Sequence, residues 1–211
     1  MNAPRVIAVG PSNPEPALLE EAVACLRRGG LVAFPTETFY GLGANALDPG
    51  AVARVFRVKG RPEFKPILVL VDSVKMAESL ALEVPDLARG LMAAYWPGPL
   101  TLVLRAVPAV PVELAAGTGT VGMRIPAHPV ALALVRAAGF PVTAPSANPS
   151  GEEPPVTAER VRKFLGGRVD LILDGGPTPG GRPSTVLDLS VSPPRVLREG
   201  ALDVSAFLAR A

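Results

Sequence analysis

The hydrophobic residues of this 211-residue chain follow two patterns, one with helical spacing and one without any polar face. A helical pattern that Asn13 can cap ends at Gly29. A second helix is expected to begin at Asp48 and Pro49 and to end near Gly60. Further helical patterns lie at 73–81, 85–95, 128–139 and 157–165, and a last amphipathic helix is expected from Asp203.

Short apolar runs without a polar face separate these helices. Such a run, for example residues 67–71, is typical of a strand in a covered sheet. Strands are expected near residues 31–34, 67–71, 100–104, 120–126, 142–144, 169–173, 184–189 and 195–197. Strands that alternate with helices predict an α/β fold with a mixed sheet. The length and apolar content suit one domain over residues 1–211.

Composition narrows the class of protein. With 48% hydrophobic and 19% charged residues, the chain has the balance of a globular protein. The single cysteine, Cys25, rules out a disulfide framework within one chain and a cysteine-based metal site, which favours a reducing, cytoplasmic setting. No apolar run reaches the roughly 18 residues of a membrane helix, and the N-terminus lacks the apolar core of a signal peptide. We therefore expect a soluble protein that does not enter a membrane.

Several familiar catalytic signatures do not fit. A P-loop motif is absent, and the G-x-G-x-x-A spacing at residues 41–46 begins only at the seventh residue after its strand, unlike the immediate turn of a dinucleotide-binding fold. The only histidine, His128, precedes Pro129 at a helix start. Capping or packing explains this histidine better than a hydrolase triad does.

Positive charge is concentrated between residues 51 and 66. This stretch holds Arg54, Arg57, Lys59, Arg61 and Lys65 against Glu63 alone, whereas the formal net charge of the whole chain is +2. Lys59 and Arg61 flank a glycine at a helix end, so both side chains can point at one anion, and a guanidinium can bind two phosphate oxygens at once. Cations that complement a helix dipole would explain part of the same stretch. The stretch alone therefore leaves phosphate binding open.

Polar residues also follow other apolar runs. Ser146 and Asn148 come after the predicted strand 142–144, at the strand end where open α/β sheets bind ligands, although both residue types also build ordinary turns. The remaining candidates, each at the end of an apolar run, are Thr120, Arg124, Ser184 and Arg198. Together these hydroxyl and guanidinium groups suit a small polar ligand plus a nucleotide.

Eight motifs in chain order make the sequence similar to a known family. They are FPTETFYGLGANA, KGRP, WPGPLT, RIPAHP, APSAN, DGG, STVLDL and VLREG. In this order and at compatible spacings they closely resemble the YrdC/Sua5 family, the L-threonylcarbamoyladenylate synthases. The similarity covers residues 14–207 and corresponds to the short, single-domain form.

The resemblance implies a fold and a reaction. The family fold is a twisted, open α/β sheet with flanking helices and a large, positively charged cavity, which is also reported to bind double-stranded RNA. Members convert ATP, L-threonine and bicarbonate, with Mg²⁺, into threonylcarbamoyl-AMP and pyrophosphate. A downstream transferase complex then completes N6-threonylcarbamoyladenosine at position 37 of tRNA. Mg²⁺ is expected to arrive with ATP, and no residue of this chain is assigned as its ligand.

The resemblance also implies roles for individual residues. Lys59 and Arg61 match a K-x-R signature and are the expected catalytic cations, while Ser146 and Asn148 match an S-x-N signature. The expected ATP-binding residues are Lys59, Arg61, Lys65, Thr120, Ser146, Asn148 and Arg198. The expected threonine-binding residues are Thr36, Arg124, Ala144 and Ser184.

Two positions depart from the family pattern. Leu70 stands on the strand where many relatives carry a histidine, and Pro183 stands where some carry a glutamate. These differences put two particular substrate contacts in doubt and leave both signatures intact.

The residues support a mechanism without a covalent nucleophile. We expect Lys59, Arg61 and Mg²⁺ to neutralise the phosphates while Arg124 and the loop hydroxyls align the amino acid. The alternative is a non-catalytic factor that binds double-stranded RNA or the ribosome through the same basic cavity.

Overall fold

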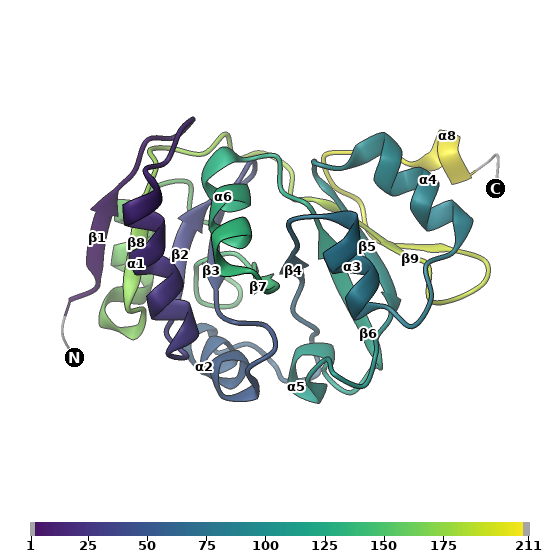
Figure 1. Ribbon diagram of the computed structural model, residues 1–211, viewed down its shortest axis with the longest axis horizontal. Coiled ribbons are helices and arrows are strands. Elements are labelled where there is room, and N and C mark those ends of the chain that lie inside the picture. Colours follow the sequence, from purple (N-terminus) through teal and green to yellow (C-terminus); the bar gives the residue numbers. More distant parts are fainter. Residues whose placement is uncertain (1–2, 209–211) are drawn as a thin grey trace.

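The computed structural model describes residues 3–208, apart from the side chain of residue 206. The strands are β1 (Arg5–Ala8), β2 (Val32–Pro35), β3 (Tyr40–Gly43), β4 (Val69–Leu70), β5 (Leu100–Arg105), β6 (Thr120–Arg124), β7 (Val142–Thr143), β8 (Leu171–Asp174), β9 (Thr185–Asp188) and β10 (Arg195–Arg198). The helices are α1 (Pro16–Arg27), α2 (Pro49–Lys59), α3 (Val74–Leu80), α4 (Asp86–Tyr95), α5 (Val112–Ala115), α6 (Pro129–Ala138), α7 (Ala158–Leu165) and α8 (Ser205–Leu208), with a 3₁₀ turn at Gly166–Arg168. Figure 1 shows β1 and α8 at opposite ends of the long axis.

The strands form two mixed sheets. One has the order β1-β8-β2-β3, with parallel β1-β8 and β8-β2 pairs and an antiparallel β2-β3 pair. The other has the order β10-β9-β5-β6-β4-β7 and also combines parallel and antiparallel pairs. The predicted α/β class with a mixed sheet is confirmed, while the strands are divided over two sheets.

The two sheets meet where β3 and β7, an edge strand of each, lie side by side (Figure 1). Backbone hydrogen bonds of 2.7–3.0 Å join residues 40–46 to residues 141–147. We call these two segments the seam. The fully buried Thr143 strengthens it, because its hydroxyl donates to the carbonyl of Leu42 and accepts from the amide of Ala44, each at 2.9 Å. The seam makes the two sheets nearly continuous.

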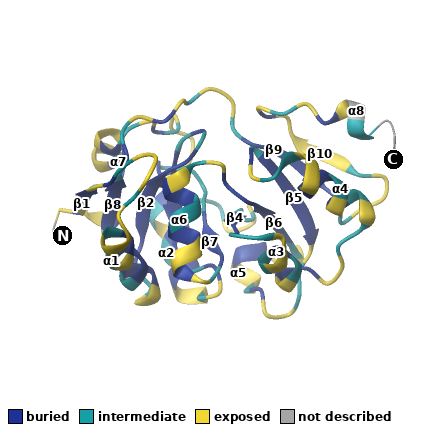
Figure 2. Cartoon of the chain, turned by 45° about the horizontal axis from the view of Figure 1, so that its top comes forward, coloured by how far each residue is buried: buried dark blue, intermediate teal, exposed yellow. Residues whose placement is uncertain are grey.

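The core extends through both sheets. One hydrophobic cluster contains Ala33 and Leu42 of the first sheet together with Leu102 and Met123 of the second. Figure 2 shows the buried strands between helices whose outer faces are exposed. A second cluster lies between the first sheet and the helices α1 and α6, which pack against each other. No helix among the described residues is long and apolar enough to cross a membrane.

Two predicted helix starts are confirmed by their caps. The Asp48 side chain accepts from the amides of Gly50 and Ala51 at the start of α2, which ends at Gly60 in the left-handed conformation. His128 caps α6, since its Nδ1 accepts from the amide of Val130 at 3.2 Å. The histidine therefore has the structural role that its position beside a proline predicts.

The predicted cap of the first helix is wrong. Helix α1 begins at Pro16 with Glu15 as its N-cap, and Asn13 lies outside it. Because Glu15 precedes a proline, its backbone is held extended, at φ −66° and ψ 127°, so the helix cannot start earlier. The short helix α5 was not predicted, and the part of the last predicted helix beyond residue 208 lies outside the described residues.

Strand β3 corrects the expectation of a loop after residue 34. Its glycines weaken the strand signal because glycine has low strand propensity. Here they allow close packing: a Cβ at Gly43 would lie 2.7 Å from the Phe34 ring. Tyr40 and Leu42, which alternate with Gly41 and Gly43 along the strand, are fully buried. The glycine spacing therefore serves the packing of a strand and not a dinucleotide-binding turn.

The seam generates a stability prediction. In a Thr143→Val variant the buried amide of Ala44 loses its acceptor, so we expect the free energy of unfolding to fall by about 1–3 kcal/mol. Urea unfolding followed by circular dichroism measures this change. The matched control is Thr118→Val at an exposed threonine, which should change stability by less than about 0.5 kcal/mol. Equal losses in the two variants would contradict a special role for the seam hydroxyl.

Candidate functional site

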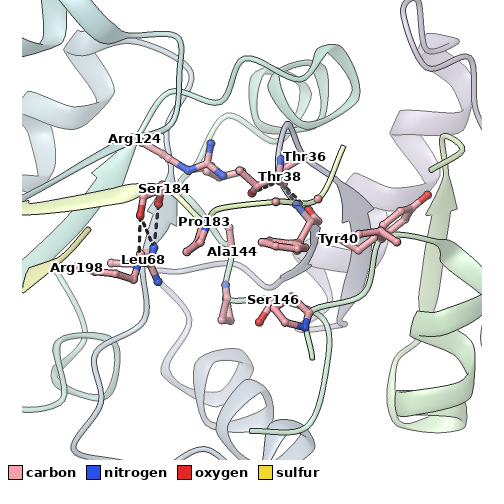
Figure 3. A pocket seen from close by; sticks show the side chains of 18 of the residues that line it. Thr36, Thr38, Tyr40, Leu68, Arg124, Ala144, Ser146, Pro183, Ser184 and Arg198 are labelled. Carbon is pink, nitrogen blue, oxygen red and sulfur yellow. Dashed lines mark hydrogen bonds between the residues drawn. The ribbon is translucent and has the colours of Figure 1, made fainter. Parts of the chain in front are cut away.

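A cavity of about 690 Å³ opens beside the seam. Residues from both sheets line it, including Tyr40 of β3 and Arg124 of β6 (Figure 3). Seven of the predicted site residues lie on its wall: Thr36, Arg61, Arg124, Ala144, Ser146, Ser184 and Arg198. These residues come from six separate parts of the chain, so the fold brings distant candidates to one place.

Arg198 is fixed on the wall by Ser184 (Figure 3). Its Nε and Nη2 donate to the Ser184 carbonyl at 3.0 and 2.9 Å, and Nη2 also contacts the Ser184 hydroxyl at 3.0 Å. The fully buried Thr101 hydroxyl lies 2.9 Å from the same serine oxygen. Burial lowers the pKa of Arg198, and the nearby charges of Arg124 and Arg61 lower it further. The three guanidinium groups therefore act on one another across the cavity.

Arg61 follows Gly60, the left-handed residue at the end of α2, and lines the cavity. Its Nε donates to the carbonyl of Lys65 at 3.0 Å and its Nη2 to that of Pro66 at 2.8 Å. Burial lowers the pKa of this guanidinium. Both acceptors are neutral, so the positive charge of Arg61 has no carboxylate partner among the described residues.

Lys59 and Asn148 lie next to the cavity wall and do not line it. Lys59 is only 3% exposed, and its ammonium donates to the carbonyls of Ser146 and, at 2.7 Å, Asn148. The Lys59 carbonyl accepts from the amide of Ser150 at 2.7 Å. The Asn148 amide group donates to the carbonyl of Glu152 at 2.6 Å. The predicted K-x-R and S-x-N signatures are thus joined by direct hydrogen bonds.

Lys65 and Thr120 are not brought to the cavity. Lys65 is exposed on the loop after α2. The Thr120 hydroxyl lies 2.8 Å from that of Thr118, at the start of β6. Their predicted ATP contacts stay predictions that this geometry does not support.

Thr36 lies at the cavity, where its hydroxyl also builds a turn. It donates to the carbonyl of Phe39 at 2.7 Å and accepts from the amides of Thr38 and Phe39. This hydroxyl-rich turn presents the PTET stretch to the ligand space. The residue that builds the turn therefore also lines the cavity.

Two residues that sequence reasoning did not assign support the wall. Glu37 forms an ion pair with Arg124, in which both side chains are largely buried. Thr101 holds the Ser184 hydroxyl from below the surface. Glu37 lies inside the PTET motif. The sequence therefore shows a carboxylate there but does not reveal that Arg124 is its partner. Thr101 ends the WPGPLT motif at the start of an apolar strand, where nothing in the sequence pointed to Ser184 as its partner.

The two positions that depart from the family pattern both border the cavity. Leu70 and Pro183 line it, together with Leu68. They add apolar surface where a histidine or a glutamate would have added polar groups.

No set of three or more His, Cys, Asp or Glu side chains able to hold a metal occurs within residues 3–208. The donor set therefore does not fit a metal held by the protein alone.

The buried lysine predicts a pH-dependent stability. Burial, with a smaller contribution from Arg61, lowers the pKa of Lys59 from 10.5 to about 7. Between these values the unfolded chain binds more protons than the folded one, so the free energy of unfolding rises with pH. From pH 7 to pH 9 this rise should be about 2 kcal/mol larger in the wild-type protein than in Lys59→Met.

Urea unfolding at the two pH values measures this difference. Lys163→Met, which removes an exposed lysine of α7, is the control and should keep the wild-type pH dependence. A Lys59→Met protein with an unchanged pH dependence would show that this lysine does not carry the effect.

Comparison with known proteins supports the family resemblance that the eight sequence motifs indicate. Residues 24–200 match the Sua5/YciO/YrdC family model, which is described as "Telomere recombination". A threonylcarbamoyl-AMP synthase of Pyrococcus abyssi is 48% identical over 181 residues. The match covers 86% of this chain and 53% of that protein, so the chain spans about half the length of this relative.

Solved structures show the same fold. The crystal structure of P. abyssi Sua5 complexed with L-threonine has a TM-score of 0.91 at 45% identity, covering 95% of this chain and 59% of that one. The crystal structure of E. coli YciO has a TM-score of 0.88 at 32% identity, covering 97% of this chain and 99% of that one. The chain therefore belongs to the Sua5/YciO/YrdC family, as its eight motifs predict.

Proposed function

We propose that this chain is an L-threonylcarbamoyladenylate synthase, which makes threonylcarbamoyl-AMP and pyrophosphate from ATP, L-threonine and bicarbonate. The observation that carries the proposal is the shared cavity, which unites candidates for both substrates from distant parts of the chain. The name of the P. abyssi relative and the L-threonine in the P. abyssi Sua5 structure support it.

The nucleotide is assigned to the part of the cavity that Arg61 and Arg198 line. Within residues 3–208 these two guanidinium groups donate to neutral oxygens and have no carboxylate partner, so their charges remain available to phosphates. Ser146 lies on the same wall, and Lys59 fixes the position of its backbone by donating to the Ser146 carbonyl. Lys59 would thus act mainly through the position of the loop and through its charge.

The amino acid is assigned to the side formed by Thr36, Arg124, Ala144 and Ser184. In the described part of the chain the Arg124 side chain has one hydrogen bond, to Glu37, so its other N–H groups can bind a carboxylate. The hydroxyls of Thr36 and Ser184 offer additional polar contacts. Leu68, Leu70 and Pro183 surround the ligand space with apolar groups that suit a small side chain.

The reaction needs positioning and charge stabilisation more than a covalent nucleophile. The threonine ammonium first loses a proton to solvent, and the free amine then forms an N–C bond to the carbon of bicarbonate as water leaves, which gives the carbamate. A carbamate oxygen then attacks the α-phosphorus, and the bond to pyrophosphate breaks. Arg61 and Arg198 would stabilise the charge that develops on the phosphate oxygens. Mg²⁺ would enter with ATP, and no step is assigned to a protein-bound metal.

The proposal includes a place in tRNA modification. The product is a reactive mixed anhydride, so a transferase must consume it, and we assign that role to the complex that modifies adenosine 37 of tRNA. The setting would be the cytoplasm, where ATP and tRNA meet. Direct binding of tRNA or double-stranded RNA is not required for the synthase reaction.

The non-catalytic RNA-binding alternative has less support. The basic stretch at residues 51–66 does not form an open row of cations, since Arg54 is engaged with Asp170 at 2.9 Å and with the carbonyl of Gly29 at 2.7 Å. Lys59 is buried, and Arg61 faces the cavity. The geometry therefore suits a small anionic ligand better than an extended phosphate backbone.

The proposed reaction gives a direct test. We expect the purified protein to release pyrophosphate from ATP only when L-threonine and bicarbonate are both present, measured by a coupled phosphate assay with mass spectrometry of the adduct. Arg61→Ala and Arg198→Ala should each lower kcat/KM by about 100-fold or more, because each removes a charged phosphate contact.

The control is Arg89→Ala, which removes an exposed arginine that pairs with Glu78 on the surface. It should retain wild-type turnover. Full activity in both cavity variants would refute the assignment of the nucleotide. Salt-sensitive binding of RNA with no threonine-dependent use of ATP would favour the non-catalytic alternative.

A further inference from the structure

Charge is distributed unequally among the three arginines of the cavity. Arg61 and Arg198 donate to carbonyl and hydroxyl oxygens, which carry no net charge. Arg124 pairs with the carboxylate of Glu37. Within the described part of the chain it is the only one of the three with an acidic partner. Among the described residues, Arg124 therefore has a counter-charge in a salt bridge, whereas Arg61 and Arg198 do not.

The Glu37–Arg124 pair is shielded from solvent. The Glu37 side chain is 16% exposed and that of Arg124 is 8% exposed. The Oε1 atom of Glu37 accepts from Nη1 of Arg124, while its Oε2 is buried with no hydrogen-bond partner in residues 3–208. No hydrogen bond therefore spreads the charge of Oε2, and its field acts on Arg124 with little screening.

Glu37 does not face the ligand space directly. Arg124 lines the cavity, whereas Glu37 is absent from its wall. Burial lowers the pKa of Arg124, and the charge and hydrogen bond of Glu37 counteract that effect, so the carboxylate helps to keep the guanidinium protonated. The pair thus offers N–H donors in a fixed direction without a net charge.

The charge of each end decides which ligand it prefers. An unpaired guanidinium attracts every anion, and a polyphosphate more strongly than a monocarboxylate. A neutral pair gains less from a net anion, because the buried carboxylate repels it. A zwitterionic amino acid has no net charge, so it can use the N–H donors of Arg124 without that repulsion.

We propose that Glu37 is a specificity-determining positioning residue, which neutralises Arg124 so that this end of the cavity selects a zwitterionic amino acid over phosphates and over acids without an amino group. The inference rests on the proposed function for the assignment of L-threonine to the Arg124 end. It adds a physical reason why ATP and threonine do not exchange places in a cavity with three arginines.

The test compares two ligands that differ in one group. L-Threonine and 2,3-dihydroxybutanoate share the carboxylate and the β-hydroxyl, and a hydroxyl replaces the amine in the second. Calorimetry gives the ratio of their dissociation constants for the wild type and for Glu37→Gln, which keeps an acceptor for Arg124 and removes the charge. We expect the preference for threonine to fall by roughly tenfold or more in the variant.

Kinetics separate this role from a loss of structure. Because Glu37 touches no reacting atom, Glu37→Gln should change the KM for L-threonine and keep kcat at saturating threonine within about threefold of wild type. Tripolyphosphate should compete with threonine in the variant and only with ATP in the wild type. Glu37→Asp, which keeps the charge, should restore most of the preference for threonine.

The matched control is Glu83→Gln, which removes the acidic member of an exposed pair with Arg105. It should leave the ligand preference unchanged. A folded Glu37→Gln protein with the wild-type preference would overturn the inference. If that variant fails to fold, displacement of threonine by tripolyphosphate in the wild type would overturn it instead. A wild-type protein that binds no L-threonine would refute the proposed function itself.

Discussion

The pairing of residues 40–46 with residues 141–147 is the constraint on which the cavity depends. It joins the edge strands of two sheets, and it places the turn before β3 opposite the loop after β7. The turn carries Thr36 and Glu37, and the loop carries Ser146. Because backbone hydrogen bonds and the buried Thr143 hydroxyl hold this register, a shift by one residue would turn the side chains of the seam to the opposite face. The same contacts thus connect the core and shape the ligand space.

Lys59 adds a second connection at the same place. In the sequence, Lys59 and Arg61 together indicate two phosphate contacts. In the structure, the ammonium of Lys59 instead donates to two carbonyls of the loop that contains Ser146. The lysine therefore stabilises the conformation of the S-x-N loop, while Arg61, two residues later, faces the cavity. The two signatures are parts of one structure, so a change in either is expected to disturb the other.

Local signals in the sequence predicted local structure well. The cap of α2 at Asp48, its end at Gly60 and the capping role of His128 all depend on residues close in the chain, and the structure confirms them. The division into two sheets and the Glu37–Arg124 pair depend on contacts between distant residues, which spacing alone does not reveal, and the glycines of β3 masked its strand signal. The family resemblance assigned distant residues such as Arg61 and Arg198 to one site, because a family pattern indirectly reflects contacts between distant residues. It did not separate wall residues from the exposed Lys65.

The cavity contains more positive charge than its acidic partners neutralise, and this has a consequence for stability. Burial and the charges of Arg124 and Arg61 lower the pKa of Arg198, and burial, with a smaller contribution from Arg61, lowers the pKa of Lys59. Cations kept close together oppose folding, so the free protein retains an unfavourable electrostatic energy at this site. An anionic ligand relieves the repulsion, and the free energy released adds to its binding. Affinity for a polyphosphate and reduced stability of the empty protein therefore have the same cause.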